Sequence, residues 1–495
     1  MNPLSKAFGF MRAMWTFARY EAGLRYNPRR TFLPGFVQDA HIDADQCTRM
    51  ELVRKSRWFE KNDALANRIA EVYTEFTVGA FGPTVSPESS DEDWNLRASD
   101  WLDEWSQVAD LNSKFGYGGL MTTACWREFF DGEFFLLKTG ERGRPRLQGI
   151  SAHRVATPPD LYDQEGSTII DGVRIDKRGR PISYFIQEGF DDERFTERTA
   201  NEVIHLFEPS APNQYRGLPK LTPVMNLLHD WNDLCMFEMQ KAKDNAQITN
   251  IWENATGSFS PQQARQNRFL PTQTAPTDSI DSQRYEFIKR VLGPKSVAVK
   301  SGEKILQLKN ESPSAATQWL WDYMASLICA GVGVSKLLVF PWSLQGTVAR
   351  SELDLATNYF RSRFATFARA SFEVYLFAMG TARFSDVRVA DAPFDWTRIE
   401  VLPPRAPNVD VGRNSAAMIA ELESGATTLK DIYLPRNQSW RKQIDQRGRE
   451  EQVIDITAKK YGLTPDRIRR AIAESMKAQM AAETEKQRQE DLQPA

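Results

Sequence analysis

Cysteine and histidine are both scarce in this chain, which has four of each among 495 residues. The cysteines, Cys47, Cys125, Cys235 and Cys329, stand far apart and form no C-x-x-C pair. This spacing argues against a zinc site and against a disulfide framework, and it is typical of reduced thiols in an intracellular setting. With so few histidines, general acid–base chemistry and metal binding have few carriers.

Motifs of catalysis and nucleotide binding are also absent. The sequence contains no GxxxxGK[ST] phosphate loop, no GxGxxG turn, no HExxH zinc motif and no GxSxG nucleophile turn. Cys125 and His153 could be imagined as nucleophile and base, but the apolar neighbours of Cys125 favour an inert core thiol. His229 and Cys235 stand six positions apart, so a helix would not bring them onto one face. We therefore predict no catalytic residue, no metal site and no cofactor.

Excess charge of one sign and long apolar runs are missing as well. Lys and Arg number 63 against 65 Asp and Glu, a net charge of −2, which lacks the basic excess that sequence-independent DNA wrapping requires. Any contact with nucleic acid is expected to be local or weak. The uncharged run at residues 323–335 is too short to span a bilayer, and residues 1–30 have no apolar signal core. We expect neither export nor membrane insertion.

What the chain does contain indicates a folded α+β protein of two to four domains, since 41% of its residues are hydrophobic. Polar helical segments are predicted at residues 45–76 and 91–111. From residue 124 to 207 the pattern changes to short strands and turns, and Asp131-Gly132 is interpreted as a hairpin turn. The predicted strands are residues 133–138, 172–176 and 181–186.

Helical periodicity returns in the second half of the chain. Helices are predicted at residues 220–246 and 315–330, and a long one, roughly 48 Å, runs from residue 347 to a stop at Gly380. Residues 331–346 between them have no helical period. A buried helical hairpin and a wall of something larger are both compatible with this pattern. Other predicted elements are a hairpin of residues 296–300 with 304–309 and carboxy-terminal helices at 416–423, 446–461 and 465–480.

Short motifs spread over most of the chain resemble, in their order, those of lambda-type tailed-bacteriophage portal proteins (head–tail connectors). Residues 171–176 with 179–181 are similar to the family's β-motif, and residues 214–217 resemble the approach to its stem helix. The remaining matches are residues 17–22, 54–57, 61–62, 126–127, 131–133, 302–303, 330–334, 350–352 and 425–430.

The resemblance implies a portal-type α+β fold with an α+β wing, long stem helices, a small mixed α/β clip insertion and a helical carboxy-terminal crown. The implied boundaries are an amino-terminal arm and wing at 1–219, a first stem helix at 220–247, a clip at 248–311, a second stem helix and following turn at 312–338, a tunnel loop at 339–346, a long wing helix with wing strands at 347–407, a crown at 408–482 and a disordered tail at 483–495.

The same resemblance suggests which residues meet DNA and partners. In the tunnel loop, Trp342, Ser343 and Gln345 would project toward DNA, with Lys336 and Arg350 as phosphate contacts. Alternatively, Trp342 packs beneath a neighbouring wing and touches no DNA. The stem candidates are Lys241 and Lys243, and the candidate partner-binding residues of the clip are Lys300, Lys304 and Lys309.

The implied assembly is a ring, typically of twelve subunits, at one capsid vertex of the virion, assembled in the host cytoplasm. Double-stranded DNA would pass through it during packaging and ejection. The implied partners are the terminase large subunit, head-completion or adaptor proteins, and the major capsid and scaffolding proteins, with no membrane involved. Another ring-forming phage connector without a packaging role remains an alternative. An enzyme acting on DNA would need clustered carboxylates or a nucleotide loop.

The missing phosphate loop generates the first prediction. The purified protein should hydrolyse neither ATP nor DNA, because the sequence offers no phosphate cradle and no metal-binding carboxylate cluster. A phosphate-release assay and a nuclease gel on the purified chain check this expectation. Turnover that a point mutation in this chain abolishes would contradict it.

Overall fold

The computed structural model of the chain describes residues 39–141, 143–161, 169–189, 194–253, 295–299, 315–340, 346–404, 418–433, 436, 438–471 and 474. The chain divides into two compact units. The first draws on residues before Leu52, on His153–Ala200 and on Glu208–Gly217, and the second on Leu52–Ala152, Asn201–Phe207 and Leu218 onward. Helices and small sheets are mixed, which confirms the predicted combination of helix and strand.

The first unit is built on a four-stranded antiparallel sheet in the order β4-β5-β6-β7. Its elements are the helix α2 (Ala40–Asp43), the 3-10 turns η3 (Ala152–Arg154) and η4 (Pro159–Leu161), and the strands β4 (Ile169–Ile170), β5 (Val173–Ile175), β6 (Pro181–Gln187) and β7 (Phe195–Thr199). The predicted strands at 172–176 and 181–186 are thus confirmed as β5 and β6.

Two buried arginines hold the turn that joins β4 to β5. Asp171 has a positive φ of 46°, a conformation that costs free energy for a residue with a side chain. Its carboxylate accepts hydrogen bonds from Arg49, and Arg216 Nη1 lies 3.1 Å from Asp171 Oδ1. Arg216 also donates to the carbonyl of Val155 at 2.8 Å. The charged hydrogen bonds offset the strain of the turn.

The second unit contains a three-stranded antiparallel sheet in the order β3-β2-β8, formed by β2 (Glu133–Glu141), β3 (Arg144–Ile150) and β8 (Val203–Phe207). β2 is central, and Phe135 lies opposite Ile150 on one side and His205 on the other. Side chains alternate between faces. Phe134 and Leu136 join the helical core, while Phe135 stacks on His205 with ring centroids 4.2 Å apart.

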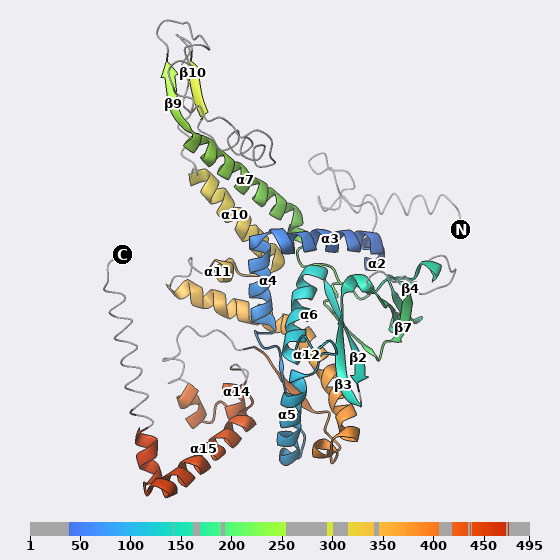
Figure 1. Ribbon diagram of the computed structural model, residues 1–495, viewed down its shortest axis with the longest axis vertical. Coiled ribbons are helices and arrows are strands. Elements are labelled where there is room, and N and C mark those ends of the chain that lie inside the picture. Colours follow the sequence, from blue (N-terminus) through green and yellow to red (C-terminus); the bar gives the residue numbers. More distant parts are fainter. Residues whose placement is uncertain are drawn as a thin grey trace, which may run out of the picture. The chain divides into compact units, whose positions relative to one another are not determined.

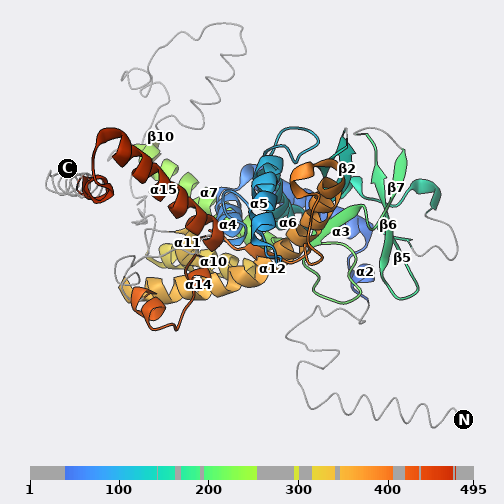
Figure 2. The same cartoon turned by 90° about the horizontal axis from the view of Figure 1, so that it is seen from below.

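Helices pack against this sheet and against one another (Figures 1 and 2). The helices of the second unit are α3 (Gln46–Asn62, begun in the first unit), α4 (Ala64–Thr77), α5 (Glu92–Gln107), α6 (Tyr117–Asp131), η5 (Thr222–Val224), α7 (Met225–Gln247), α10 (Ala315–Val332), α11 (Lys336–Val339), α12 (Gly346–Ser385), η7 (Val387–Val389), α14 (Leu429–Tyr433) and α15 (Trp440–Tyr461). Two strand pairs complete it, the antiparallel pair of β1 (Thr84–Pro87) with β11 (Ile399–Leu402) and the parallel pair of β9 (Ile248–Glu253) with β10 (Lys295–Val299).

Side-chain caps explain where two of these helices begin. Asp91 accepts a hydrogen bond from the backbone N–H of Trp94 at 3.0 Å, so α5 starts directly after it. Asp63 accepts from the backbone N–H of Ala66 at 2.6 Å and starts α4. The second cap divides the predicted helical segment 45–76 into α3 and α4.

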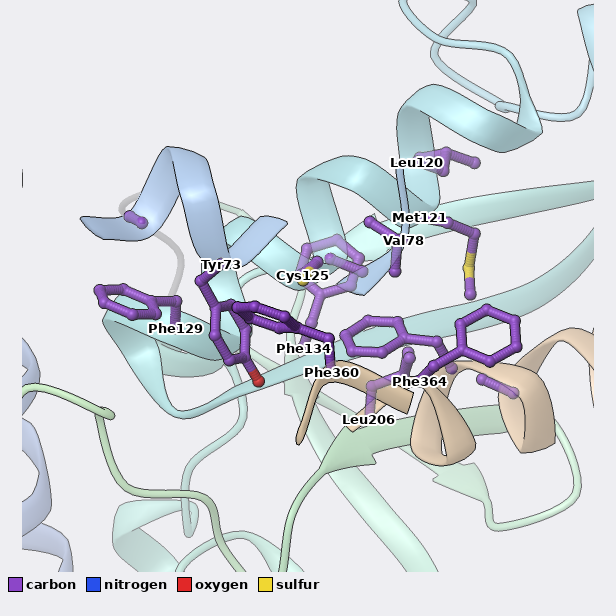
Figure 3. Close-up of a cluster of buried hydrophobic side chains, with 14 of the residues drawn as sticks. Tyr73, Val78, Leu120, Met121, Cys125, Phe129, Phe134, Leu206, Phe360 and Phe364 are labelled. Atoms are coloured by element: carbon purple, nitrogen blue, oxygen red, sulfur yellow. The ribbon is translucent and has the colours of Figure 1, made fainter. Parts of the chain in front are cut away.

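The core of the second unit gathers around α4, α6 and α12 (Figure 3). Tyr73 of α4 lies 5.3 Å from Phe129 of α6 and 6.2 Å from Phe360 of α12, measured between ring centroids. These contacts combine burial of large apolar area with tilted and edge-to-face ring packing, which stabilises the three-helix junction.

The interpretation of Asp131-Gly132 as a hairpin turn is wrong. Asp131 is the last residue of α6, and Gly132 ends the helix in the left-handed conformation with φ 86°. A Cβ on Gly132 would lie 2.3 Å from the backbone carbon of Leu218, so no side chain fits there. Consequently residues 124–131 are helical where strands and turns were expected.

The long helix also departs from its predicted end. α12 has 40 residues, about 60 Å, and continues past Gly380 to Ser385. Ala378, Met379 and Ala382 around that glycine are fully buried, and their packing outweighs the roughly 1 kcal/mol cost of glycine in a helix. The segment 331–346 is not free of helix either, because Ser335 caps the short helix α11, which buries Leu338.

Several other boundaries shift. α7 begins at Met225, because the preceding residues form the 3-10 turn η5, and α10 extends to Val332. α15 begins at Trp440, six residues before the predicted start. The described partner of β10 is the parallel strand β9, whereas residues 304–309, its expected hairpin partner, lie outside the described residues.

Gly333 supports the second prediction. It has φ +81°, and a Cβ there would lie 2.5 Å from the hydroxyl of Tyr359, which donates to the carbonyl of Val332 at 3.0 Å. Gly333→Ala should therefore lower the free energy of unfolding by about 2–3 kcal/mol, measured by urea denaturation. Gly425→Ala is the matched control, since Gly425 has φ +74° but nothing within 4 Å of the position that a Cβ would take. An equal loss in both variants would contradict the steric part of the argument.

Candidate functional site

The predicted stem contains side chains that are candidates for a functional role. α7 and α10 lie side by side in the second unit (Figure 1). On α10, Ala325, Ile328 and Val332 are buried. Thr317 Oγ1 lies 3.5 Å from Glu238 Oε1 of α7. Each helix thus uses one face to bind its partner.

The opposite face of α10 carries large apolar side chains in contact with solvent. Trp319 is 66% exposed and stacks on Tyr323, with ring centroids 5.3 Å apart and planes within 5°. Leu320 and Leu327 lie on the same side of the helix. On α7, Phe237 is 71% exposed, and Met236 and Met239 are also exposed. We call these seven exposed large apolar side chains of α7 and α10, taken together, the stem patch.

A buried charge cluster lies where the chain enters α7. Glu128 of α6 is 2% exposed, and its carboxylate lies 3.2 Å from Lys220 Nζ. The hydroxyl of Tyr73 donates to the same carboxylate at 3.1 Å. Burial raises the pKa of Tyr73 well above its usual value, and the charge of Glu128 adds to the shift. The tyrosine therefore stays a hydrogen-bond donor.

A second pair adjoins the first. Asp131 is fully buried, and Arg57 of α3 binds it with two hydrogen bonds of 2.8 and 2.7 Å. These bonds raise the pKa of the Arg57 guanidinium. Arg127 pairs with Glu60 of α3, whose carboxylate also accepts from the indole N–H of Trp126 at 2.8 Å. α3 and α6 are thereby joined by charge-assisted hydrogen bonds.

The aromatic residues of α3 hold the first turns of α7. His229 lies 4.6 Å from Phe59 and 5.5 Å from Trp58, measured between ring centroids. Asn232, one turn further, donates to the Asp63 carboxylate that caps α4. His229 therefore has a packing role, as the spacing from Cys235 suggests.

An open cleft of about 600 Å³ lies between the α10–α11 turn and α12. Its lining is mainly apolar and includes Ala330, Val334, Leu355 and Tyr359. At its polar edge the Ser335 hydroxyl donates to Glu352 at 2.7 Å. The cleft continues the exposed side of α10, because Ser326 and Ala330 lie one and two turns beyond Tyr323.

The residues predicted to meet DNA are placed as follows. Lys336 begins α11 and forms an ion pair with Asp322. Lys241 lies on α7 with Nζ 3.5 Å from Glu238, and Lys243 is exposed on the same helix. Arg350 belongs to α12, but its side chain is outside the described set. Trp342, Ser343, Gln345, Lys300, Lys304 and Lys309 lie outside the described residues.

The described part of the chain offers little evidence for a metal site, a reactive thiol or a membrane span. No three of its His, Cys, Asp and Glu side chains are grouped so that they could hold a metal ion. Burial raises the pKa of the Cys125 thiol well above its ordinary value, which keeps it protonated and unreactive. Within the same ranges, no helix combines the length and the apolar character needed to cross a membrane.

Sequence reasoning missed the charge cluster at the entry to α7. The signal available was the group Arg127, Glu128, Asp131 and Glu133 inside an otherwise apolar stretch. Charged residues in such a stretch are buried only if they are paired. Their partners, Lys220 and Arg57, are 92 and 74 positions away from Glu128 and Asp131, and periodicity carries no information about contacts at that separation.

The Lys220–Glu128 pair generates the third prediction. Lys220→Met should lower the free energy of unfolding by about 3 kcal/mol, because a buried carboxylate would lose its cation. Adding Glu128→Gln should recover part of the loss. Lys430→Met is the control, since Lys430 forms a more exposed pair with Glu400 at 3.0 Å, and should cost about 1 kcal/mol or less. Equal urea midpoints for Lys220→Met and Lys430→Met would refute this assignment.

Comparisons with known proteins place the chain in a family. Residues 36–340 match the family model described as phage portal protein, lambda family. A curated relative, a probable portal protein of Halomonas phage phiHAP-1, is 22% identical over 221 residues. That alignment covers 41% of this chain and 43% of the relative, so the match spans less than half of the relative's length.

Two solved structures are similar at low sequence identity. The neck of an empty GTA particle, computed with C6 symmetry, gives a TM-score of 0.43 at 13% identity and covers 78% of this chain and 92% of that chain. The virion of a native gene transfer agent particle gives 0.41 at 14% identity, covering 78% and 93%. Because the family model matches more than half of its residues, the chain belongs to the lambda family of phage portal proteins.

Proposed function

We propose that this chain is the subunit of a portal ring, expected to contain twelve copies, which conducts double-stranded DNA at one capsid vertex of a virion. The observation that carries the proposal is the family match over residues 36–340. That range includes α7, α10 and α11, and therefore the helices of the proposed stem. The charge cluster at the entry to α7 would fix these helices to the wing.

The stem patch supports assembly into a ring. Seven large apolar side chains on two adjacent helices are exposed, and a contact between subunits would remove them from water. A head-to-tail contact between identical chains would cover the patch in every copy and close by rotation. The open cleft beside α12 extends the same side of α10 and would contribute to this contact.

The charges of the stem suit a conduit. Lys241 and Lys336 already pair with Glu238 and Asp322, so their positive charge is partly neutralised within the subunit. With a net charge of −2, the ring would release few counterions from DNA and hold its phosphates weakly. Weak binding lets the duplex slide. The tunnel-loop residues Trp342 and Gln345 remain the proposed narrowest contact on the sequence resemblance.

The same proposal includes the partners. The terminase large subunit would supply the energy for packaging, since this family is structural and the chain has no phosphate loop. Head-completion or adaptor proteins would dock on the clip, and the major capsid and scaffolding proteins would surround the wing. These roles follow from family membership.

The stem patch gives the fourth prediction. Trp319→Ser with Tyr323→Ser should shift the purified protein from rings toward monomers, because two exposed aromatic side chains would be lost from each interface. Mass photometry and electron microscopy along the particle axis measure the change. Phe384→Ser is the control: it removes an aromatic ring that is 92% exposed at the end of α12, outside the stem, and should leave rings intact.

Two outcomes would count against the proposal. A wild-type chain that stays monomeric in the presence of scaffolding and capsid proteins would argue against a ring. The second outcome is that the chain forms rings normally, but DNA packaging in infected cells is unchanged when these rings are lost. That result would favour a connector without a packaging role.

A further inference from the structure

The attachment of α15 to the second unit differs from that of every core helix. Of its residues, Ala458 is buried, whereas Ile444, Val453, Ile456 and Tyr461 are exposed. Among the described elements, its main backbone neighbour is α14, and that contact is small. Apolar burial therefore contributes little to holding α15 in place.

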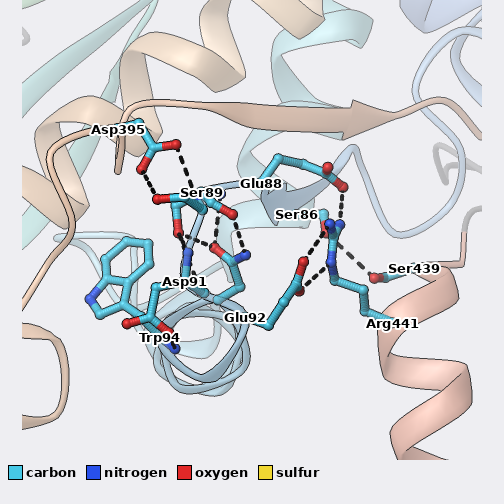
Figure 4. Close-up of polar contacts among 11 residues, drawn as sticks. Ser86, Glu88, Ser89, Asp91, Glu92, Trp94, Asp395, Ser439 and Arg441 are labelled. Atoms are coloured by element: carbon cyan, nitrogen blue, oxygen red, sulfur yellow. Dashed lines mark hydrogen bonds and ion pairs between the residues drawn. The ribbon is translucent and has the colours of Figure 1, made fainter.

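Polar contacts concentrate in the first turn of α15 (Figure 4). Arg441 binds Glu92 of α5 with two hydrogen bonds of 2.6 and 2.9 Å and also pairs with Glu88. Lys442 Nζ lies 2.6 Å from Asp103, further along α5. The hydrogen bonds from Arg441 lower the pKa of Glu92, so this carboxylate stays charged over a wider pH range.

Two further contacts frame these ion pairs. The Ser439 and Ser86 hydroxyls are 3.4 Å apart, which joins the cap of α15 to β1. The Arg441 guanidinium lies 4.7 Å above the ring of Trp440, which keeps it in place for the two glutamates. α14, which packs on α15, has its own tie through Lys430 to Glu400.

The charged groups of this contact differ in their exposure to solvent: the side chains of Arg441 and Glu88 are 16% and 20% exposed, and that of Lys442 is 34% exposed. The side chains of Glu92 and Asp103 are 59% and 68% exposed, whereas Glu128 and Asp131 are buried. Salt screens exposed ion pairs strongly and buried ones weakly. Raising the ionic strength should therefore weaken the attachment of α15 long before it affects the core.

We propose that the first turn of α15 is an electrostatic latch, through which Arg441 and Lys442 hold α14 and α15 on α5 and β1. Opening the latch releases the two helices together and leaves the core of α4, α6 and α12 folded. Ionic strength sets the fraction of open latches. The inference rests on these contacts alone and does not require the ring.

Hydrogen exchange tests the latch on the full chain and is the fifth prediction. Amides of α15 should exchange roughly tenfold faster at about 0.5 M than at about 0.05 M NaCl, since the freed helix is only marginally stable alone. Arg441→Gln with Lys442→Gln should exchange fast at both salt concentrations. Arg449→Gln is the matched control: its partner Asp445 lies within α15 at 2.8 Å, so the salt response should persist.

A covalent lock provides a second readout. Ser86→Cys with Ser439→Cys, made with Cys47→Ser to remove the exposed native thiol, should form a disulfide at low salt, because the two hydroxyls are already adjacent. Oxidation should abolish the salt response of α15, and reduction should restore it. Mass photometry at both salt concentrations reports the oligomeric state separately.

Several results would overturn the latch. These are an α15 exchange rate that salt and the double glutamine variant leave unchanged, a salt response that survives the disulfide, and failure of the cysteine pair to oxidise at low salt. Faster exchange of α4, α6 and α12 together with α15 would likewise reject it, since it would show global unfolding.

Discussion

Two buried carboxylates at the end of α6 impose the main constraint on the second unit. Glu128 and Asp131 have almost no contact with solvent, and a buried carboxylate without a cation is strongly destabilising. Lys220 pairs with the first and Arg57 with the second, so α3 and the segment leading to α7 must both meet the last turn of α6. Gly132 permits this approach, because the backbone of Leu218 occupies the space of a side chain. The apolar core packs around a junction whose polar geometry is already determined.

Local signals in the sequence were sufficient to predict a helix or strand where nearby residues alone determine it. Asp91 caps α5, and the short apolar runs of β2 and β6 form strands as predicted. Prediction from the sequence failed where contacts between residues distant in the sequence determine the structure. Gly118 lies inside α6 because its missing side chain admits the carbonyl of Phe81, and Gly380 is retained in α12 by its buried neighbours. The charge cluster was missed for the same reason, and the proposed DNA contacts at Trp342 and Gln345 remain predictions from the sequence.

The structure also explains why two separated motifs occur together in the first unit. Residues 171–176 and 214–217 were matched independently to portal motifs, and the structure brings them into contact. Arg216 pairs with Asp171 in the strained turn before β5, and a Cβ on Gly179 would lie 2.8 Å from the hydroxyl of Tyr215. The arginine, the aspartate and the glycine thus form one structural unit. A change at one of them would leave the others without a partner or without space.

α12 has a mechanical consequence because it is continuous. In its first half, Tyr359 is held against the end of α10 by the hydrogen bond to Val332, and in its second half Tyr375 donates to the carbonyl of Trp396 at 2.7 Å. Between these points and beyond them α12 continues without a proline, over about 60 Å measured along its path. A tilt of about one degree around one end moves the other by about 1 Å. The helix therefore acts as a lever. A movement at one end that is too small to disturb the packing there becomes, at the other end, a shift as large as the range of distances that a hydrogen bond tolerates.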